Sequence, residues 1–357
     1  MTKSKALVGL NMFCNIGSAR LSKLLEYFGE PENILKASYD ALAATGIGAK
    51  ITGKVCALKE KDIDKELHLA EKFKLKIVTT GDEDYPDNLK EIPGAPIVLY
   101  VKGDLKKEDR SAIAIVGSRR ASPYGLENAC RFSGDLAGSG MTVVSGLARG
   151  VDTAAHKGAL KKGGRTIAVI GSGFGHIYPP ENKKLAEEIC RSGAVISEFP
   201  VGAKPLPENF PRRNRVISGL SLGVLVAEAA MNSGALITAD FALEQGREVF
   251  ALPGKIDSEN SFGTNELIKQ GAKLVSSAEE IMEEFNLPVQ KDHPVRALSD
   301  GESLLYRLLS DEPLYFDDIA ERSGMSVVEI SSGLLKLQMR KLVSQLPGKQ
   351  FIRNRTS

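Results

Sequence analysis

Three arginines and an asparagine stand together near the middle of the chain, where residues 212–215 have the sequence Arg-Arg-Asn-Arg. Phe210 and Pro211 precede them. Arginine stays charged at every working pH, and its planar guanidinium donates two parallel hydrogen bonds to phosphate oxygens in a geometry that lysine does not reproduce. The cluster therefore predicts an anion site, and phosphate is the anion whose shape fits it.

Short loops that combine glycine, hydroxyl or charged residues occur at other points in the chain. They lie at 117–123, 145–152, 171–176, 197–200 and 232–238. Backbone N–H groups at a glycine turn or at the start of a helix are free to bind phosphate oxygens. We therefore expect these loops, the arginines and Lys204 to form one phosphate-binding surface.

Each of these loops follows an apolar run that has the length of a strand. From residue 111 onward, strands are predicted at 113–116, 142–145, 167–170, 195–197, 224–227 and 249–252, and two more at 76–80 and 97–101. Apolar strands that alternate with helical stretches are typical of a parallel sheet covered on both faces. Because ligands of such sheets bind beyond the carboxyl ends of the strands, the loops should meet at one edge.

The predicted fold class is therefore α/β, with an extended Rossmann-like, doubly wound, mostly parallel sheet. Loop 171–175 has the spacing G-x-G-x-G, whereas a nicotinamide site needs G-x-G-x-x-G in the first βαβ unit. We therefore expect no nicotinamide cofactor.

The two ends of the chain have a different pattern. Residues 6–65 carry leucines at helical spacing, and glycine turns at 15–19 and 45–49 each open a helix. These turns resemble those of SAM or helix-hairpin-helix units, whose backbone amides approach a phosphate. Plain helix–helix turns explain the same residues equally well.

Beyond a proline-containing linker at 287–298, three helical patterns and a hairpin predict a winged helix. Its recognition helix is not basic, so contact with a protein or a role in stability is at least as good an expectation as groove reading. The predicted domains are a helical domain at 1–65, an extended Rossmann-like core at 66–290 and a winged helix at 298–355.

Composition agrees with a multidomain globular protein of 357 residues, 42% of them hydrophobic and 26% charged. The net charge is only +2, so any affinity for nucleic acid must come from local clusters of basic residues. The chain has no apolar run near the roughly 20 residues of a membrane span and no signal peptide, which predicts a cytoplasmic protein. Its four cysteines are scattered, which predicts buried free thiols and no metal site.

Several motifs follow one another in order between residues 111 and 254. They are Val116-Gly117-Ser118-Arg119, Ser145-Gly146-Leu147-Ala148-Arg149-Gly150-Val151-Asp152, Ile170-Gly171-Ser172-Gly173, Ser197-Glu198-Phe199-Pro200, Phe210-Pro211-Arg212-Arg213-Asn214-Arg215, Ser233-Gly234-Ala235-Leu236-Ile237-Thr238 and Phe250-Ala251-Leu252-Pro253-Gly254. In this combination the chain resembles the DNA-processing protein A family, DprA, also called Smf.

The resemblance implies a core that binds single-stranded DNA, shields incoming strands and helps to load the RecA recombinase in natural transformation. It also implies a homodimer formed through the core, with no enzymatic activity, catalytic residue, cofactor or metal. The arginine cluster and the strand-end loops supply the expected DNA contacts. They are Gly117, Ser118, Arg119, Arg120, Ser145, Gly146, Arg149, Gly171, Ser172, Gly173, Lys204, Phe210, Arg212, Arg213, Asn214, Arg215, Ser233 and Gly234.

Two other functions are compatible with parts of the sequence. A Rossmann-like nucleotide phosphoribohydrolase would use Glu228 and Thr238, although its P-G-G-x-G-T-x-x-E signature is absent. A transcription factor would read duplex DNA with the winged helix.

Bases of a bound single strand would stack on exposed aromatic rings, for which Phe174, Tyr178 and Phe210 are the candidates.

Overall fold

The structure is a computed structural model that describes residues 1–12, 16–287, 298–310, 312–340 and 342–354. The chain forms two compact units, Met1–Val289 and Gln290–Ser357. The predicted linker at 287–298 lies, except for its two end residues, outside the described residues.

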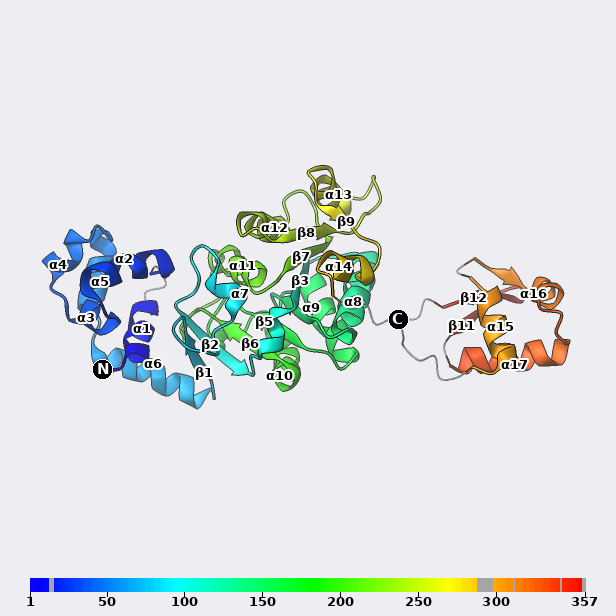
Figure 1. Cartoon of the computed structure of the whole chain (residues 1–357), viewed down its shortest axis with the longest axis horizontal. Helices are drawn as coiled ribbons and strands as arrows, with labels where there is room; N and C mark the ends of the chain where they lie inside the picture. The colour runs from blue at the N-terminus through cyan, green and yellow to red at the C-terminus, as the bar shows by residue number, and fades with distance from the viewer. Residues whose placement is uncertain (13–15, 288–297, 311, 341, 355–357) are drawn as a thin grey trace. The chain divides into compact units, whose positions relative to one another are not determined.

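A nine-stranded sheet forms the centre of the first unit within the described residues, in the order β1-β2-β6-β5-β4-β3-β7-β8-β9 (Figure 1). All neighbours from β6 to β9 are parallel, and only the pairs β1–β2 and β2–β6 are antiparallel. The predicted mostly parallel α/β fold is therefore confirmed. The strands are β1 (Lys76–Thr79), β2 (Val98–Gly103), β3 (Ala112–Gly117), β4 (Thr142–Ser145), β5 (Thr166–Val169), β6 (Ala194–Ser197), β7 (Gly223–Glu228), β8 (Glu248–Ala251) and β9 (Lys273–Leu274).

The strand order reverses beside β3. The chain runs from β3 through β4 and β5 to β6 in one direction across the sheet, and then returns to place β7 on the other side of β3. The loops that leave β3 and β7 therefore diverge to opposite faces of the sheet. Such a switch point leaves a crevice at the carboxyl ends of the strands, and ligands of open α/β sheets bind there.

Helices cover both faces of the sheet because successive strand residues point to opposite sides. On β3, Ile113 and Ile115 pack with α8 and α9, whereas Ala114 and Val116 lie in the cluster that includes α11 and α12. Ser122 caps α8 by accepting a hydrogen bond from the Gly125 amide, as its position before Pro123 predicts. The helices are α7 (Asp87–Lys90), α8 (Pro123–Gly138), α9 (Val151–Lys161), α10 (Lys183–Ser192), α11 (Asn209–Gly219), α12 (Gly234–Glu244), α13 (Phe262–Lys269) and α14 (Ala278–Glu284).

Six helices precede the sheet in the described residues, and their apolar side chains share one hydrophobic cluster with β2 and α10. The predicted boundary at residue 65 falls inside the last of these helices, and the division at this point stays a prediction. The helices are α1 (Lys3–Asn11), α2 (Ser18–Phe28), α3 (Pro31–Lys36), α4 (Tyr39–Ala44), α5 (Ala49–Ala57) and α6 (Glu60–Lys72).

The second unit is a winged helix, as predicted. Helices α15 (Asp300–Leu308), α16 (Phe316–Ser323) and α17 (Val327–Met339) enclose a separate core with a sheet in the order β10-β12-β11. Its strands are β10 (Leu314–Tyr315), β11 (Val343–Leu346) and β12 (Gln350–Arg353).

Among the described residues, no helix is long and apolar enough to cross a membrane, and no cluster of side chains is suited to hold a metal ion. Cys56, Cys130 and Cys190 are free thiols. Cys56 is exposed because it lies on the outer side of α5, and Cys130 and Cys190 are half-buried, so the prediction of buried thiols is wrong for Cys56 and is met only in part at the other two. Cys14 lies outside the described residues.

Candidate nucleic-acid interface

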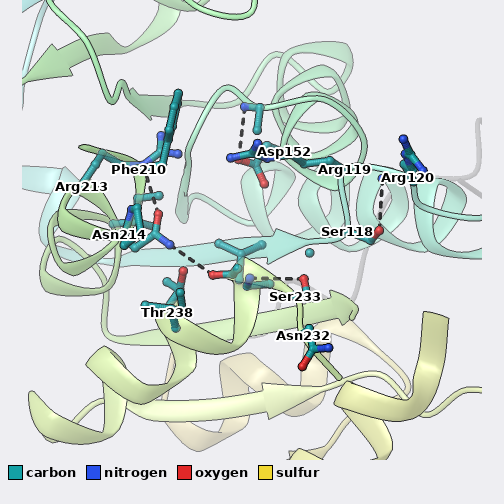
Figure 2. A pocket seen from close by; sticks show the side chains of 18 of the residues that line it. Ser118, Arg119, Arg120, Asp152, Phe210, Arg213, Asn214, Asn232, Ser233 and Thr238 are labelled. Carbon is teal, nitrogen blue, oxygen red and sulfur yellow. Dashed lines mark hydrogen bonds between the residues drawn. The ribbon is translucent and has the colours of Figure 1, made fainter. Parts of the chain in front are cut away.

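A cavity of about 850 Å³ opens at the switch point between β3 and β7 (Figure 2). The loop after β3 lines it at 117–120, the loop after β7 and the start of α12 line it at 230–238, and α11 lines it at Phe210 and the residues that follow. These segments lie far apart in the sequence, and the sheet topology brings them together at the predicted edge.

Arg119 and Arg120 supply exposed positive charge at this cavity. No carboxylate of the described residues lies within ion-pair distance of either guanidinium. The hydroxyl of Ser118 accepts a hydrogen bond from the Arg120 amide and so fixes the turn that carries both side chains. Lys204 is exposed too, next to Pro205, which lines the cavity. These three cations are accessible to a bound anion.

Two neighbouring aromatic rings lie between two guanidiniums along the rim. The Arg119 guanidinium lies 5.2 Å from the centroid of the Phe210 ring, and the centroid of Tyr178 is 5.8 Å from that of Phe210. Arg149 lies 5.8 Å from the Tyr178 centroid. Tyr178 is exposed and Phe210 is half-buried, whereas Phe174 is a core residue, so the idea that Phe174 is a stacking surface is wrong. A pair of rings with a guanidinium at each end offers planar surfaces to bases and positive charge to phosphates.

The start of α12 forms the opposite wall of the cavity. The Ser233 hydroxyl accepts a hydrogen bond from the Ala235 amide, and the Asn214 side-chain amide donates to the Gly234 carbonyl at 3.2 Å. Thr238, one turn further along, is buried and lines the cavity (Figure 2). The first turn of a helix carries partial positive charge, which favours an anion at this wall.

Arg213 is not an accessible cation, contrary to the prediction. Only 4% of the residue is exposed, and its Nη1 donates to the backbone carbonyls of Gly146 and Val169 at the carboxyl ends of β4 and β5. Burial lowers the pKa of Arg213 to about 10, an effect that Asp152 opposes. The guanidinium therefore ties α11 to two strand ends instead of binding phosphate.

Asp152 lies near Arg213 and is buried beneath the rim of the cavity. Burial raises the pKa of its carboxyl group, while the nearby Arg213 acts in the opposite direction. The carboxylate accepts hydrogen bonds from the amides of Gly146 and Ala148 at 3.1 and 3.2 Å. It therefore holds the preceding loop, and the N-cap residue of α9 is Gly150.

Two further arginines of the cluster face a buried carboxylate. Nη2 of Arg215 lies 2.6 Å from Oε2 of Glu198, and Nη2 of Arg212 lies 3.7 Å from the same oxygen. Arg215 is mostly buried, so its prediction as a DNA contact is wrong. Arg212 keeps about a third of its side chain exposed and remains a candidate.

Arg149 is paired as well, because its Nε donates to Oε1 of Glu181 at 2.5 Å. Both side chains are about half exposed, and ion pairs in that setting are weak. A phosphate can therefore replace Glu181 as the partner of Arg149.

The glycine loop at 171–173 and the Ser145-Gly146 turn are buried supports rather than contact surfaces. The Ser145 hydroxyl donates to the Ile115 carbonyl, and that of Ser172 donates to the His176 carbonyl. A side chain at Gly171 would place its Cβ 2.9 Å from the Phe210 ring, so this glycine allows the ring to sit at the strand end. Because all five residues are buried, the structure contradicts their prediction as DNA contacts, including the contact expected from the backbone amide of Gly171.

Glu228 is also structural. Its buried carboxylate accepts hydrogen bonds from the amide and hydroxyl of Ser122 at 2.7 and 2.6 Å, and thereby joins the end of β7 to the start of α8. A general acid or base must reach the substrate proton within hydrogen-bond distance. Because both carboxylate oxygens of Glu228 are held by Ser122, Glu228 is poorly placed to act on a substrate, which weighs against the phosphoribohydrolase hypothesis.

Asn232 and Asn260 line the cavity but are absent from the predicted contacts. Asn260 comes from the 3₁₀ turn η4 (Glu259–Ser261), beyond β8. A hydrogen bond of 2.7 Å from the Gly263 amide to the Ala229 carbonyl brings this segment to the loop after β7. Nothing in the local sequence indicates that contact.

The outer side of α17, the recognition helix of the winged helix, mixes apolar side chains with an acidic one and two hydroxyls at Glu329, Ser331 and Ser332. Val327, Val328 and Leu335 are exposed there, and Lys336 is its exposed cation between residues 327 and 338. A helix that enters the DNA major groove normally offers several basic or amide side chains. This surface therefore gives little support to the duplex-reading hypothesis.

The fold and the cavity define a doubly wound, Rossmann-like α/β protein with a crevice at its switch point that is lined by arginine and polar side chains. Residues 76–286 match the family model of the DNA recombination-mediator protein A, and residues 289–349 match the DprA winged helix domain. The chain belongs to this DprA family, which confirms the resemblance inferred from the motifs.

Individual proteins of this family are similar to the chain in sequence and in structure. Protein Smf of Escherichia coli K12 is 41% identical over 318 residues, which cover 86% of this chain and 85% of that protein. The X-ray structure of DprA from Streptococcus pneumoniae is similar with a TM-score of 0.67 at 38% identity, and the match covers 80% of this chain and 98% of that one. DNA processing protein A from Helicobacter pylori, described for its unique single-stranded DNA binding mode, has a TM-score of 0.53 at 31% identity over 59% of this chain and 96% of that one.

Proposed function

We propose that this protein binds single-stranded DNA along the rim of the switch-point cavity. The observation that carries the proposal is a row of four side chains, in which the rings of Phe210 and Tyr178 lie between the guanidiniums of Arg119 and Arg149. Arg149 lines a smaller pocket beside the cavity, which it shares with both rings. In a single strand the bases are free to stack on the two rings, while successive phosphates reach the guanidiniums. In a duplex the base faces are already stacked, so they are not available to these rings.

Other cations extend the same surface. Arg120, Lys204 and the exposed part of Arg212 supply positive charge around the cavity, and the start of α12 offers backbone amides at Ser233 and Gly234. The H. pylori relative is described as a single-strand binder, which supports this assignment.

The proposed role in the cell is that of a recombination mediator. The protein would shield incoming single strands in the cytoplasm and help to load the RecA recombinase in natural transformation, without enzymatic activity. Membership in a recombination-mediator family supports this role. The three-domain division at 1–65, 66–290 and 298–355 belongs to the same proposal.

A homodimer formed through the core is also part of the proposal. Strand β9 lies at one edge of the sheet, and its Leu274 is 47% exposed. An open sheet edge with an apolar side chain favours pairing with a second chain.

The test is a titration of labelled oligo(dT) and of a duplex at two salt concentrations, with wild type and Arg119→Ala. We expect preferential binding of the single strand. The variant should bind more weakly, and the slope of log K against log salt should fall in magnitude by about 0.7, the contribution of one phosphate on a single strand.

The matched control is Arg131→Ala. This guanidinium also lies over a phenylalanine ring, 5.0 Å from the Phe132 centroid, but it is on α8 and does not line the cavity. It should leave affinity and slope unchanged. Equal affinity for single strand and duplex, or an Arg119→Ala variant that binds like wild type, would refute the proposal.

A further inference from the structure

A short loop between β6 and α11 lies under the cationic rim. Its first residue, Glu198, holds Arg215 and Arg212 through its carboxylate at 2.6 and 3.7 Å. The ring of the next residue, Phe199, lies below the Arg212 guanidinium, with 5.7 Å between the guanidinium carbon and the ring centroid. The position of this loop therefore determines where Arg212 stands.

The same loop supports the aromatic part of the rim. The Gly173 amide donates to the Ala203 carbonyl, and the Gly175 amide donates to the Val201 carbonyl, each at 2.9 Å. The backbone at Gly173 is so close to the carbonyls of Pro200 and Val201 that no side chain fits between them. Two residues earlier in the glycine loop, Gly171 packs against Phe210. A shift of the loop would therefore displace both Arg212 and Phe210.

Two side chains from the N-terminal helices hold this loop from the other side. The side-chain amide of Asn11, at the end of α1, donates to the Glu198 carbonyl at 2.9 Å. Oε1 of Glu66, on α6, accepts a hydrogen bond from the Val201 amide at 2.7 Å. Both residues are only 5% exposed, so water cannot easily replace either bond.

We propose that Asn11 and Glu66 are positioning residues for the DNA site, and that the N-terminal helices set the affinity for a single strand by bracing this loop. Neither side chain lines the cavity, so the effect passes through Glu198 and Val201. This inference rests on the proposed function, because it concerns the affinity of the same rim for DNA.

The experiment measures oligo(dT) affinity and its salt dependence for full-length variants. Asn11→Ala and Glu66→Ala should each weaken binding by about five- to tenfold. The slope of log K against log salt should also fall by up to about 0.7, since the poorly placed Arg212 no longer neutralises a phosphate. Glu66→Gln keeps an oxygen that accepts from the Val201 amide and should bind like wild type.

Asn33→Ala is the matched control for Asn11→Ala. Asn33 lies in the same helical region, and its side-chain amide also donates to a backbone carbonyl at 2.9 Å, but that carbonyl belongs to Phe28 and not to the loop. This variant should have wild-type affinity and slope. Thermal unfolding checks that each variant is folded. Should both alanine variants fail to fold, Glu66→Asp, which withdraws the acceptor by one methylene, replaces them.

Three outcomes separate the possibilities. Folded Asn11→Ala and Glu66→Ala proteins, or a folded Glu66→Asp protein in their place, with wild-type affinity and slope would overturn the inference. A Glu66→Gln variant as weak as Glu66→Ala would overturn it too, because the lost charge would then matter and not the hydrogen bond. A wild-type protein that does not prefer the single strand in the same titration would instead refute the proposed function.

Discussion

Replacing Arg213 by alanine should damage the folded state and leave the electrostatics of DNA binding unchanged. The guanidinium donates to the Gly146 and Val169 carbonyls and faces Asp152 in a buried region. The truncation leaves two buried acceptors without a donor, at about 1–3 kcal/mol each. It also leaves a buried carboxyl group without its neighbouring cation, and removing one partner of buried charges costs about 3–5 kcal/mol. These costs overlap, so we expect a loss of about 3–5 kcal/mol.

Pulse proteolysis in a urea series suits this measurement, because the loss of the intact band follows the unfolding of the core in the full-length chain. Arg213→Ala should lower the urea midpoint strongly. Arg213→Lys should fall between alanine and wild type, since a single ammonium keeps the charge but lacks the planar fork. Arg119→Ala, a change at an exposed position, should stay within about 0.5 kcal/mol of wild type.

DNA binding by the folded fraction supplies the second half of the test. Because the Arg213 guanidinium does not reach a phosphate, the slope of log K against log salt should be the same in Arg213→Ala as in wild type. A variant with a wild-type urea midpoint and a slope reduced by about 0.7 would refute this reasoning. That result would mean that Arg213 turns outward to bind the strand.

Three other outcomes are expected. Phe210→Ala should weaken oligo(dT) binding about tenfold or more because stacking is lost, whereas Phe210→Tyr should bind like wild type. The salt slope of Phe210→Ala should stay unchanged because no charge is removed, and a changed slope would contradict a stacking role for Phe210. Burial lowers the pKa of His156 to about 3 from its ordinary 6.5. Because the unfolded chain therefore takes up the proton at a higher pH than the folded chain, the free energy of unfolding should fall by about 1.4 kcal/mol per pH unit as pH drops from about 6.5 to 3. In urea unfolding between pH 7 and 4, the free energy of unfolding should fall less steeply with pH for His156→Gln than for wild type. Parallel curves of this free energy against pH would show that His156 does not cause the fall. Glu228→Gln should cost about 1–3 kcal/mol of stability by weakening the bonds to Ser122, while wild-type protein incubated with AMP should release no adenine, and adenine release would revive the hydrolase hypothesis.

The sequence determined the sheet and the edge at which its loops meet. Strands β3 to β8 lie within one or two residues of their predicted bounds, because strands buried on both faces appear in a sequence as short apolar runs between helical stretches. The placement of β2 between β1 and β6 had no such signal. Strand neighbours are chosen by packing between distant segments, and local pattern does not specify them.

The role of each arginine was decided by the tertiary structure. Residues 212–215 lie on α11, and successive residues of a helix point about 100° apart, so a cluster in the sequence separates in space. Arg212 and Arg215, three positions apart, share the side that faces Glu198, whereas Arg213 points to the ends of β4 and β5. The sequence alone identified a cationic segment at the carboxyl edge of a parallel sheet. Which guanidinium is accessible depended on carbonyls and carboxylates that only the folded sheet brings within reach.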